Sequence, residues 1–335
     1  MSKLNVLLQT NDGYAPYAGI SMVSLFENNI DIEEIEVFII DDEISDNNKF
    51  KFGQAAEKYH RTIVFLDVSS GVEILKKAGA PTWRNAYTAY LRLFAINLLP
   101  DRIDRILYMD ADTVVEGNLD AVCTFEMNDN VVCAVKEGLI FSAYKASLGY
   151  AEEDAWYNSG VMLIDVTKWK KSDAEGRIVQ QLIKQPFYFS PDQDLINITL
   201  HEEIGTLPYE YNAIPHFHVF PYNTIVKELP RKNYYSKEEI EAGDRRAIIR
   251  HFERFVGEFP WHKGNLHPYN ALFDKYMMKS PWNDYVKQSS KAGMMVKIEK
   301  ILYKVLPKRW FFYVWAVVSK RNFEKVVAEH TNKTT

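Results

Sequence analysis

The chain contains 335 residues, of which 47% are hydrophobic and 25% are charged, as in an ordinary globular protein. Its formal net charge of −5 argues against a general nucleic-acid binder, because the phosphate backbone requires a basic surface. The two cysteines, Cys123 and Cys133, are too few and too close together for a secreted disulfide framework, which favours a reducing compartment. The first residues lack the long apolar core of a signal peptide, and we expect them to form a strand.

Short apolar runs alternate along the chain with longer segments of helical periodicity. The predicted strands, in chain order, are 4–8, 36–40, 62–66, 105–109, 131–135 and 161–164. The predicted helices among them are 16–28, 47–59 and 87–98. This alternation is typical of βαβ units, and it predicts an α/β fold with a mainly parallel sheet.

Acidic residues follow four of these predicted strands, namely Asp12, Asp41, Asp67 and Asp110. Ligands of open α/β sheets bind just outside the carboxyl ends of the strands. A single Asp in such a place is nevertheless more often a turn former or a helix cap. The four residues together therefore support the sheet assignment more than they support chemistry.

The strongest chemical signal is the segment 108–115, in which an apolar strand leads into Asp110 and Asp112. Residues two apart project to the same side of an extended chain, so both carboxylates can reach one cation. Mg²⁺ and Mn²⁺ take oxygen ligands, often share them with substrate phosphates, and stabilise a departing diphosphate. An acidic turn is the alternative for a bare Asp-x-Asp pair.

Several blocks of the sequence occur in the order and spacing of one known family. They are 10–14 (TNDGY), 90–93 (YLRL), 107–112 (LYMDAD), 157–164 (YNSGVMLI) with Trp169, 192–197 (DQDLIN), Tyr211-Asn212, His251 and Pro260-Trp261. Over 5–262 the chain resembles the retaining glycosyltransferases of family 8, which include bacterial lipooligosaccharide galactosyltransferases and glycogenin. The resemblance implies a nucleotide-sugar-binding fold of the GT-A type.

The resemblance implies a metal site. Asp110 and Asp112 would bind Mn²⁺ or Mg²⁺, and His251 would be the third protein ligand. An imidazole beside carboxylates is an acceptable ligand for Mn²⁺. A histidine at the end of an apolar strand is otherwise most often a hydrogen-bonded structural residue.

The resemblance also implies contacts with the donor nucleotide. Asn11, Asp12 and Tyr14, in the loop after the first strand, would contact the UDP part of the donor. Helix capping before Pro16 is the alternative for Asn11 and Asp12. Arg92 lies among apolar neighbours, where it needs an anionic partner. The resemblance makes that partner the donor, and a structural salt bridge with one of the Asp residues is the alternative.

Five further residues would surround the transferred sugar. By resemblance, Asn158 faces the sugar, Gln193 lies beneath the anomeric carbon, and Asp192 and Asp194 bind sugar hydroxyl groups. Glu137 falls where the family often has an Asp that touches the sugar. An acidic first turn that favours the helix dipole is the alternative for Asp192 and Asp194.

The sequence departs from the family at Phe259. The family has a Lys there that grips the diphosphate, and Arg254 or Lys263 would have to supply that charge in this chain. The departure leaves one alternative function open, a non-catalytic relative that binds a nucleotide sugar or a glycan. A nucleotidyltransferase is disfavoured, because the first loop carries no basic residue for a triphosphate.

The composition changes after Pro281. Between Lys287 and Lys325 there are ten Lys or Arg residues and two Glu residues. We predict a GT-A catalytic domain at 1–281 and a basic, aromatic, helical tail at 282–335. The apolar block 310–318 is too short to span a membrane, but basic residues beside aromatic ones suit a helix on an anionic membrane surface. A terminal helix packed on the catalytic domain is the alternative.

The resemblance predicts an enzyme that moves galactose or glucose from a UDP-sugar to a hydroxyl group, with retention at the anomeric carbon. A double displacement needs a carboxylate nucleophile near that carbon, whereas the family places the amide of Gln193 there. A front-face route, in which the leaving diphosphate helps to deprotonate the acceptor, is therefore our hypothesis. We expect the acceptor to be a glycan or a lipid-linked oligosaccharide at the cytoplasmic face of the membrane.

Overall fold

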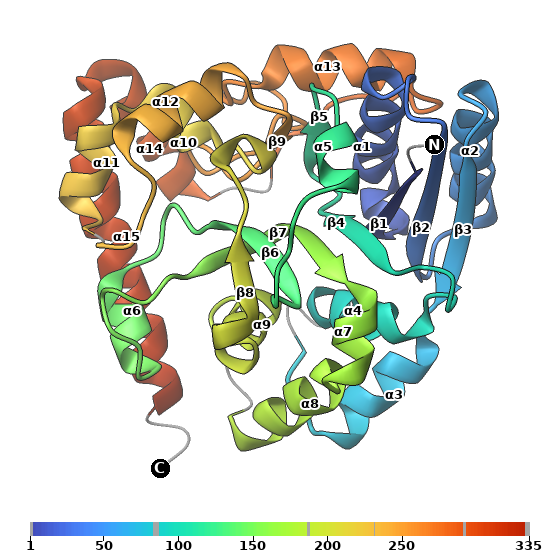
Figure 1. The fold of residues 1–335 in the computed structure, drawn as a ribbon. Helices are drawn as coiled ribbons and strands as arrows, with labels where there is room; N and C mark the ends of the chain where they lie inside the picture. Colours follow the sequence, from blue (N-terminus) through green and yellow to red (C-terminus); the bar gives the residue numbers. More distant parts are fainter. Residues whose placement is uncertain (1–2, 83–86, 186–187, 231, 291–292, 332–335) are drawn as a thin grey trace.

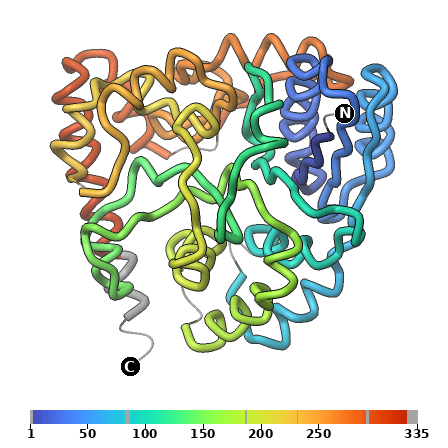
Figure 2. The backbone as a smooth tube through the Cα atoms, in the orientation of Figure 1, coloured from blue at the N-terminus to red at the C-terminus, as the bar shows by residue number. Residues whose placement is uncertain are grey.

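The computed structural model describes residues 3–82, 87–185, 188–230, 232–290 and 293–331 (Figures 1 and 2). Its strands are β1 (Lys3–Asn11), β2 (Glu34–Asp42), β3 (Thr62–Asp67), β4 (Arg105–Met109), β5 (Thr113–Val115), β6 (Val132–Lys136), β7 (Tyr157–Asp165), β8 (Ile204–Thr206) and β9 (Ile249–His251). Its α-helices are α1 (Ala15–Asn28), α2 (Asp46–Lys58), α3 (Ser69–Lys77), α4 (Thr88–Ala95), α5 (Asp120–Cys123), α6 (Ser142–Ser147), α7 (Val166–Lys171), α8 (Ala174–Lys184), α9 (Pro191–Thr199), α10 (Pro215–Val219), α11 (Tyr222–Glu228), α12 (Lys237–Arg245), α13 (Asn270–Lys279), α14 (Met294–Val305) and α15 (Lys308–Thr331).

One large sheet has the strand order β3-β2-β1-β4-β7-β6-β8. β1 is parallel to β2 and to β4, so that Val6 lies opposite both Val37 and Leu107. β2 and β3 are parallel, as are β6 and β8. β7 runs antiparallel to its two neighbours, β4 and β6. The predicted α/β fold with a mainly parallel sheet is confirmed, and the reversed direction of β7 is a feature that the apolar pattern did not reveal.

Helices cover both faces of this sheet (Figure 1). Val6 and Leu8 of β1 belong to one buried cluster, together with residues of α1, α2 and α13. Leu7 belongs to a second cluster, together with residues of α3, α4, α7, α8 and α9. Successive side chains of a strand point to opposite faces, so a strand that is covered on both sides is apolar throughout.

The helices α14 and α15 end the chain (red in Figure 1). α15 lies beside α6 and α11, and it buries Phe311, Phe312, Ala316 and Phe323. Within the described residues, no helix is both long and apolar enough to cross a membrane. The packing of α15 agrees with the alternative of a terminal helix on the catalytic domain, and association with a membrane stays a prediction.

The predicted domain boundary at residue 281 also stays a prediction. Trp282 packs on Gly19 of α1, where a Cβ atom would lie 2.1 Å from the indole ring. Its Nε1 donates a hydrogen bond to Oδ1 of Asn48 in α2 (2.8 Å). The first residue of the predicted tail is therefore packed into the core that joins α1 and α2.

Candidate active site

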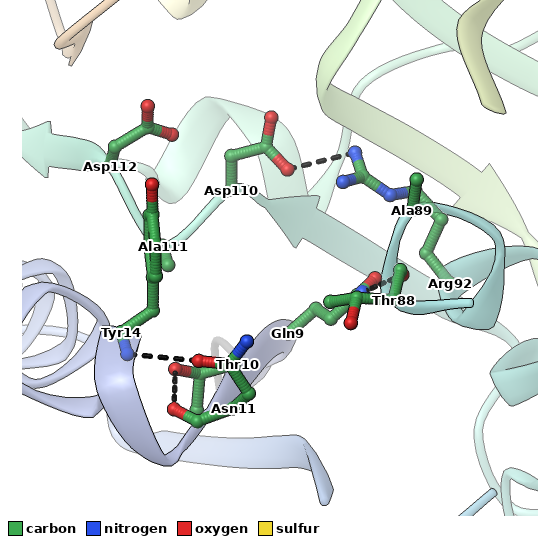
Figure 3. A pocket seen from close by; sticks show the side chains of 10 residues that line it. All are labelled: Gln9, Thr10, Asn11, Tyr14, Thr88, Ala89, Arg92, Asp110, Ala111 and Asp112. Carbon is green, nitrogen blue, oxygen red and sulfur yellow. Dashed lines mark hydrogen bonds and ion pairs between the residues drawn. The ribbon is translucent and has the colours of Figure 1, made fainter. Parts of the chain in front are cut away.

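A cavity of about 320 Å³ lies where the carboxyl ends of β1 and β4 meet. The chain changes direction across the sheet at this point, because β2 lies on one side of β1 and β4 lies on the other. Open α/β sheets bind ligands at such a switch point. Three segments line the cavity, and they contribute Gln9, Thr10, Asn11, Tyr14, Thr88, Ala89, Arg92, Asp110, Ala111 and Asp112 (Figure 3).

The three predicted metal ligands converge at this cavity. β4 leads directly into Asp110 and Asp112, and β5 then pairs with β9 so that Thr113 lies opposite His251. Nε2 of His251 lies 3.2 Å from Oδ1 of Asp112 and 3.7 Å from Oδ2 of Asp110. One ligand atom of each residue lies within 4.8 Å of the other two.

The cluster fits a divalent cation. Neighbouring ligand atoms around octahedral Mg²⁺ or Mn²⁺ lie roughly 3 Å apart, and Nε2 of His251 lies 3.2 Å from Oδ1 of Asp112. Nδ1 of His251 lies 3.1 Å from Oδ1 of Asn212, which leaves Nε2 for the cation. A Cβ atom at Gly160 would lie 2.3 Å from the His251 ring, so this glycine makes room for the imidazole.

The three groups interact strongly in the absence of a cation. Burial raises the pKa of Asp110 above its ordinary value. Burial would also raise the pKa of Asp112, but the charge and the hydrogen bond of His251 lower it. Burial would lower the pKa of His251, whereas Asp112 raises it to about 10. The carboxylate of Asp112 thus favours the protonated form of the imidazole, and a cation at Nε2 would take the place of that proton.

Arg92 connects the metal cluster to α9. One of its guanidinium nitrogens lies 2.8 Å from Oδ1 of Asp110 and 3.1 Å from Oδ2 of Asp192. The guanidinium also lies over the Tyr108 ring, 4.6 Å from its centroid. Burial alone would lower the pKa of Arg92, but the charges of Asp110 and Asp192 raise it. Arg92 thus forms the predicted salt bridge and still lines the cavity, where a donor would meet it.

The three predicted nucleotide contacts in the loop after β1 do not all face the cavity. Asn11 and Tyr14 line the cavity, and Oδ1 of Asn11 also accepts a hydrogen bond from the Tyr14 backbone N (3.0 Å). The carboxylate of Asp12 instead faces α2, where it accepts hydrogen bonds from Ser45 N (2.9 Å) and Asn48 Nδ2 (2.6 Å). The capping alternative therefore describes Asn11, which caps the turn 12–14 before α1, whereas Asp12 binds the start of α2. The contact of Asp12 with uridine stays a prediction.

Four of the residues predicted around the sugar gather at the start of β7. Ser159 donates a hydrogen bond from its hydroxyl to Oδ2 of Asp192 (2.8 Å) and from its backbone N to Oε1 of Gln193 (3.2 Å). Asn158 donates a hydrogen bond to Oε2 of Glu137 (2.7 Å). These contacts hold the side chains in place without a ligand, and the sugar contacts themselves stay predictions.

Asp194 lies deeper than its neighbours. Its Oδ2 accepts hydrogen bonds from Ser190 N (2.9 Å) and from the Tyr144 hydroxyl. Its Oδ1 has no hydrogen-bond partner within the described part of the chain. Burial raises the pKa of Asp194 to about 7. Asp192 and Asp194 also stand in the first turn of α9, as the helix-dipole alternative predicted.

Two residues beside the metal cluster have no role in the sequence-based prediction. Glu253 accepts a hydrogen bond from Asn158 (3.2 Å), and burial together with Glu137 raises its pKa to about 8. Asn212 donates to Oδ1 of Asn158 (2.8 Å) and orients His251. Glu253 could have been predicted from the sequence, because residues two apart in an extended segment project to the same side, and Glu253 follows His251 at that spacing. Asn212 belongs to the block Tyr211-Asn212 of the family resemblance, but no local pattern pointed to its role, because both of its partners are distant in sequence.

The fold is that of a glycosyltransferase of the GT-A type. The family model for glycosyl transferase family 8 matches residues 5–265, and the chain belongs to that family. The resemblance found in the sequence is therefore confirmed. Membership of the family supports an enzyme over the non-catalytic alternative.

Curated relatives match along most of the chain. General stress protein A of Bacillus subtilis (strain 168) is 26% identical over 284 residues, which are 84% of this chain and 95% of the relative. Lipopolysaccharide 1,2-glucosyltransferase of Escherichia coli (strain K12) is 27% identical over 292 residues, which are 86% of this chain and 82% of the relative.

Solved structures show the same fold. Galactosyltransferase LgtC, in complex with donor and acceptor sugar analogues, superposes with a TM-score of 0.66 at 21% identity, over 83% of this chain and 96% of LgtC. The bifunctional glycosyltransferase WbbM superposes with a TM-score of 0.71 at 20% identity, over 84% of this chain. The match covers 51% of WbbM, so this chain spans about half the length of that protein.

Proposed function

We propose that this glycosyltransferase moves galactose or glucose from a UDP-sugar to a hydroxyl group of a glycan or a lipid-linked oligosaccharide, with retention at the anomeric carbon. The observation that carries the proposal is the convergence of Asp110, Asp112 and His251 at the switch point of the sheet. The names of the glucosyltransferase and galactosyltransferase relatives support a hexose as the transferred group.

The donor would lie in the cavity between β1 and β4. Asp110, Asp112 and His251 would hold Mn²⁺ or Mg²⁺, which supplies positive charge to the diphosphate when it is bound. Asn11 and Tyr14, which line the cavity, would bind the uridine part of the donor. A polar amide and an aromatic ring are well suited to a nucleoside, because they provide a hydrogen bond and a flat apolar surface.

Gln193 would lie beneath the anomeric carbon, and Asp192 and Asp194 would orient the sugar hydroxyl groups. The amide oxygen of Gln193 accepts a hydrogen bond from the backbone N of Ser159, which fixes its orientation. An amide is a poor nucleophile, so we favour the front-face route. The acceptor oxygen bonds to the anomeric carbon while the bond from that carbon to the diphosphate breaks. The acceptor proton passes to a diphosphate oxygen.

The family's lysine binds the diphosphate, and this chain has Phe259 in its place. We assign that role to the guanidinium of Arg254. It lines a cavity of about 640 Å³ together with Asp110, Asp112 and His251. Its guanidinium lies over the Phe259 ring, 5.5 Å from the centroid. Lys263 has an exposed side chain and donates its backbone N to the carbonyl of Gln288 (2.8 Å). Arg254 is thus the better placed of the two residues to meet a diphosphate.

We also propose that α14 lies on the anionic surface of a membrane, at the cytoplasmic face of that membrane. Ile298, Ile301 and Val305 are 43%, 60% and 67% exposed, and lysines alternate with them along the helix. An exposed apolar face beside basic residues gains free energy from burial in the membrane and from attraction to anionic lipids. A glycan acceptor carried on a lipid would be presented at that surface.

Release of UDP from a panel of UDP-sugars tests the proposed reaction. With Mn²⁺ or Mg²⁺, we expect the wild type to release UDP from UDP-galactose or UDP-glucose faster than from other donors. Gln193→Ala should keep substantial turnover, because the amide is not the nucleophile. Binding of UDP without release from any donor would favour the non-catalytic alternative. Failure to bind UDP would contradict the proposal.

A further inference from the structure

The cavity that contains Arg254 reaches the C-terminal helices. It shares Asp110 and Asp112 with the smaller cavity between β1 and β4, so the two cavities meet at the metal cluster. Glu299 of α14 and Trp315 of α15 line it as well. The tail of the chain therefore faces the same space as the predicted metal ligands.

A third cavity, of about 190 Å³, continues from the second. The two share Leu139, Phe189 and Ser190. The third cavity is lined by Gln193 and Asp194 on one side and by Phe323 of α15 on another. The helix α15 thus contributes Trp315 to one cavity and Phe323 to the adjoining one, and these two aromatic residues are eight positions apart in the chain.

We propose that α15 forms a wall of the acceptor site, and that Trp315 and Phe323 pack against successive neutral hexose units at the end of the acceptor glycan. This inference rests on the proposed transfer reaction and extends it from the donor to the acceptor. If the donor nucleotide occupies the cavity between β1 and β4, the adjoining cavities are the space from which an acceptor hydroxyl group can approach the sugar.

Trp315 is held in place by its neighbours. Its ring lies 5.6 Å from the ring of His216 and 5.2 Å from that of Phe312. Phe312 is fully buried, so the helix is firmly seated at this point. Trp315 itself is only partly buried and lines the larger cavity, which leaves ring surface for a ligand.

His216 supplies an unsatisfied polar atom next to Trp315. The residue is 5% exposed and lines the same cavity, and its Nδ1 has no hydrogen-bond partner among the described residues. A buried polar atom without a partner costs about 1–3 kcal/mol, and a rotation of the ring that turns Nδ1 to a sugar hydroxyl group in this cavity would relieve that cost. Burial lowers the pKa of His216 to about 3, so the ring is neutral at physiological pH.

Phe323 occupies an aromatic cluster that reaches the predicted catalytic residues. Its ring centroid lies 4.9 Å from that of Tyr144 and 5.0 Å from that of Phe189. The Tyr144 hydroxyl in turn donates a hydrogen bond to Asp194. Asp194 lines the third cavity beside Phe323, so a sugar unit on the Phe323 ring would adjoin the residues that we assign to the donor sugar.

The chemistry of the two cavities suits a neutral sugar. The apolar C–H face of a hexose packs well against an aromatic ring, and binding sites typically combine such rings with a few placed polar groups. Glu253 and Glu299 add carboxyl groups that can form hydrogen bonds with sugar hydroxyl groups. Arg254 is the cation that we assign to the donor diphosphate.

Calorimetric titration of saccharides tests this inference. Methyl β-D-galactopyranoside and methyl β-D-glucopyranoside would be titrated into the full chain in the presence of UDP and Mn²⁺. Trp315→Ala should weaken binding by about tenfold, the value of one lost aromatic contact. Trp310→Ala is the matched control, because this residue has the same side chain on the same helix and is 51% exposed on a different surface. Trp315→Phe should restore most of the affinity.

Phe323→Ala provides a second variant in case Trp315→Ala loosens the helix. It should also weaken saccharide binding, and Phe323→Tyr, which keeps the ring, should restore most of it, while Trp310→Ala leaves release of UDP from the UDP-sugar by water within about twofold of wild type. Equal saccharide affinity in the wild type, Trp315→Ala and Phe323→Ala would overturn the inference. So would the failure of both glycosides to bind the wild type. Absence of UDP release from the wild type is a separate result, which would count against the proposed function itself.

Discussion

Arg254 is the side chain that we assign to the donor diphosphate. It stands at the cavity of the metal cluster in a chain that has Phe259 in place of the family's lysine. We predict that Arg254→Ala raises the KM for the UDP-sugar by at least about tenfold, because a charged hydrogen bond contributes about 1.5–3 kcal/mol. Lys263→Ala is the matched control and should leave KM unchanged. A larger effect of Lys263→Ala would reverse the assignment of the two residues.

His216 ties the stability of the protein to pH. Burial lowers its pKa to about 3 from an ordinary value of 6.5. Below pH 6.5 the histidine of the unfolded chain binds a proton, whereas the buried ring of the folded protein stays neutral. The free energy of unfolding is therefore highest above pH 6.5 and decreases as the pH falls. Between pH 6.5 and pH 5 this loss amounts to about 2 kcal/mol.

Urea unfolding of His216→Phe and the wild type at pH 7.5 and pH 5 measures this linkage. The variant removes the titrating ring, so its free energy of unfolding relative to wild type should rise by about 2 kcal/mol on acidification. Other groups titrate equally in both proteins and cancel in the comparison. A difference that does not change with pH would show that the ring is not held neutral in the folded protein.

The pairing of β5 with β9 is the element-scale feature that completes the metal cluster. β5 follows Asp112 directly, and its partner strand ends at His251, far along the chain. Phe252 N also donates a hydrogen bond to the carbonyl of Asp112 (2.7 Å), which fixes the histidine beside the carboxylate. The backbone ladder, more than the side chains, therefore sets the spacing between the ligands.

The helix α14 carries the prediction of membrane association. We expect the double variant Ile298→Ser with Ile301→Ser to weaken binding to vesicles of anionic phospholipid by at least about tenfold, since each buried isoleucine contributes about 1.5 kcal/mol or more. Ile30→Ser with Ile183→Ser is the matched control, because those isoleucines are 70% and 61% exposed on other elements. Equal loss in both pairs, or equal vesicle binding by all three proteins, would contradict the prediction.

At the scale of the whole molecule, local patterns predicted the parallel half of the sheet and the placement of Asp110 and Asp112. Both follow from an apolar strand that runs into acidic residues, which is visible in the sequence. The pairing of strands that are distant in the chain was not visible in the sequence. His251 entered only through the family resemblance, because its position depends on the pairing of two strands that lie far apart in the chain.

The C-terminal helices show a similar limit. The basic and aromatic composition after Pro281 predicted a helical tail, and the described residues of this segment include the helices α14 and α15. Composition does not show which face of a helix is covered. The burial of Phe312 and Phe323 and the exposure of Trp310 are consequences of packing against α6, α10 and α11. The contribution of Trp315 to a cavity beside the metal cluster was therefore not visible in the sequence.

The metal requirement of UDP-sugar turnover tests the central claim most directly. Wild-type protein treated with EDTA should lose UDP release and recover it when Mn²⁺ or Mg²⁺ is added. Asp112→Ala should be at least about a hundredfold slower with either metal, because several kcal/mol of charge stabilisation is lost. Asp101→Ala, at a surface aspartate, should behave as wild type. Full UDP release in EDTA, or by Asp112→Ala, would contradict a metal-dependent transferase with its cation at Asp110, Asp112 and His251.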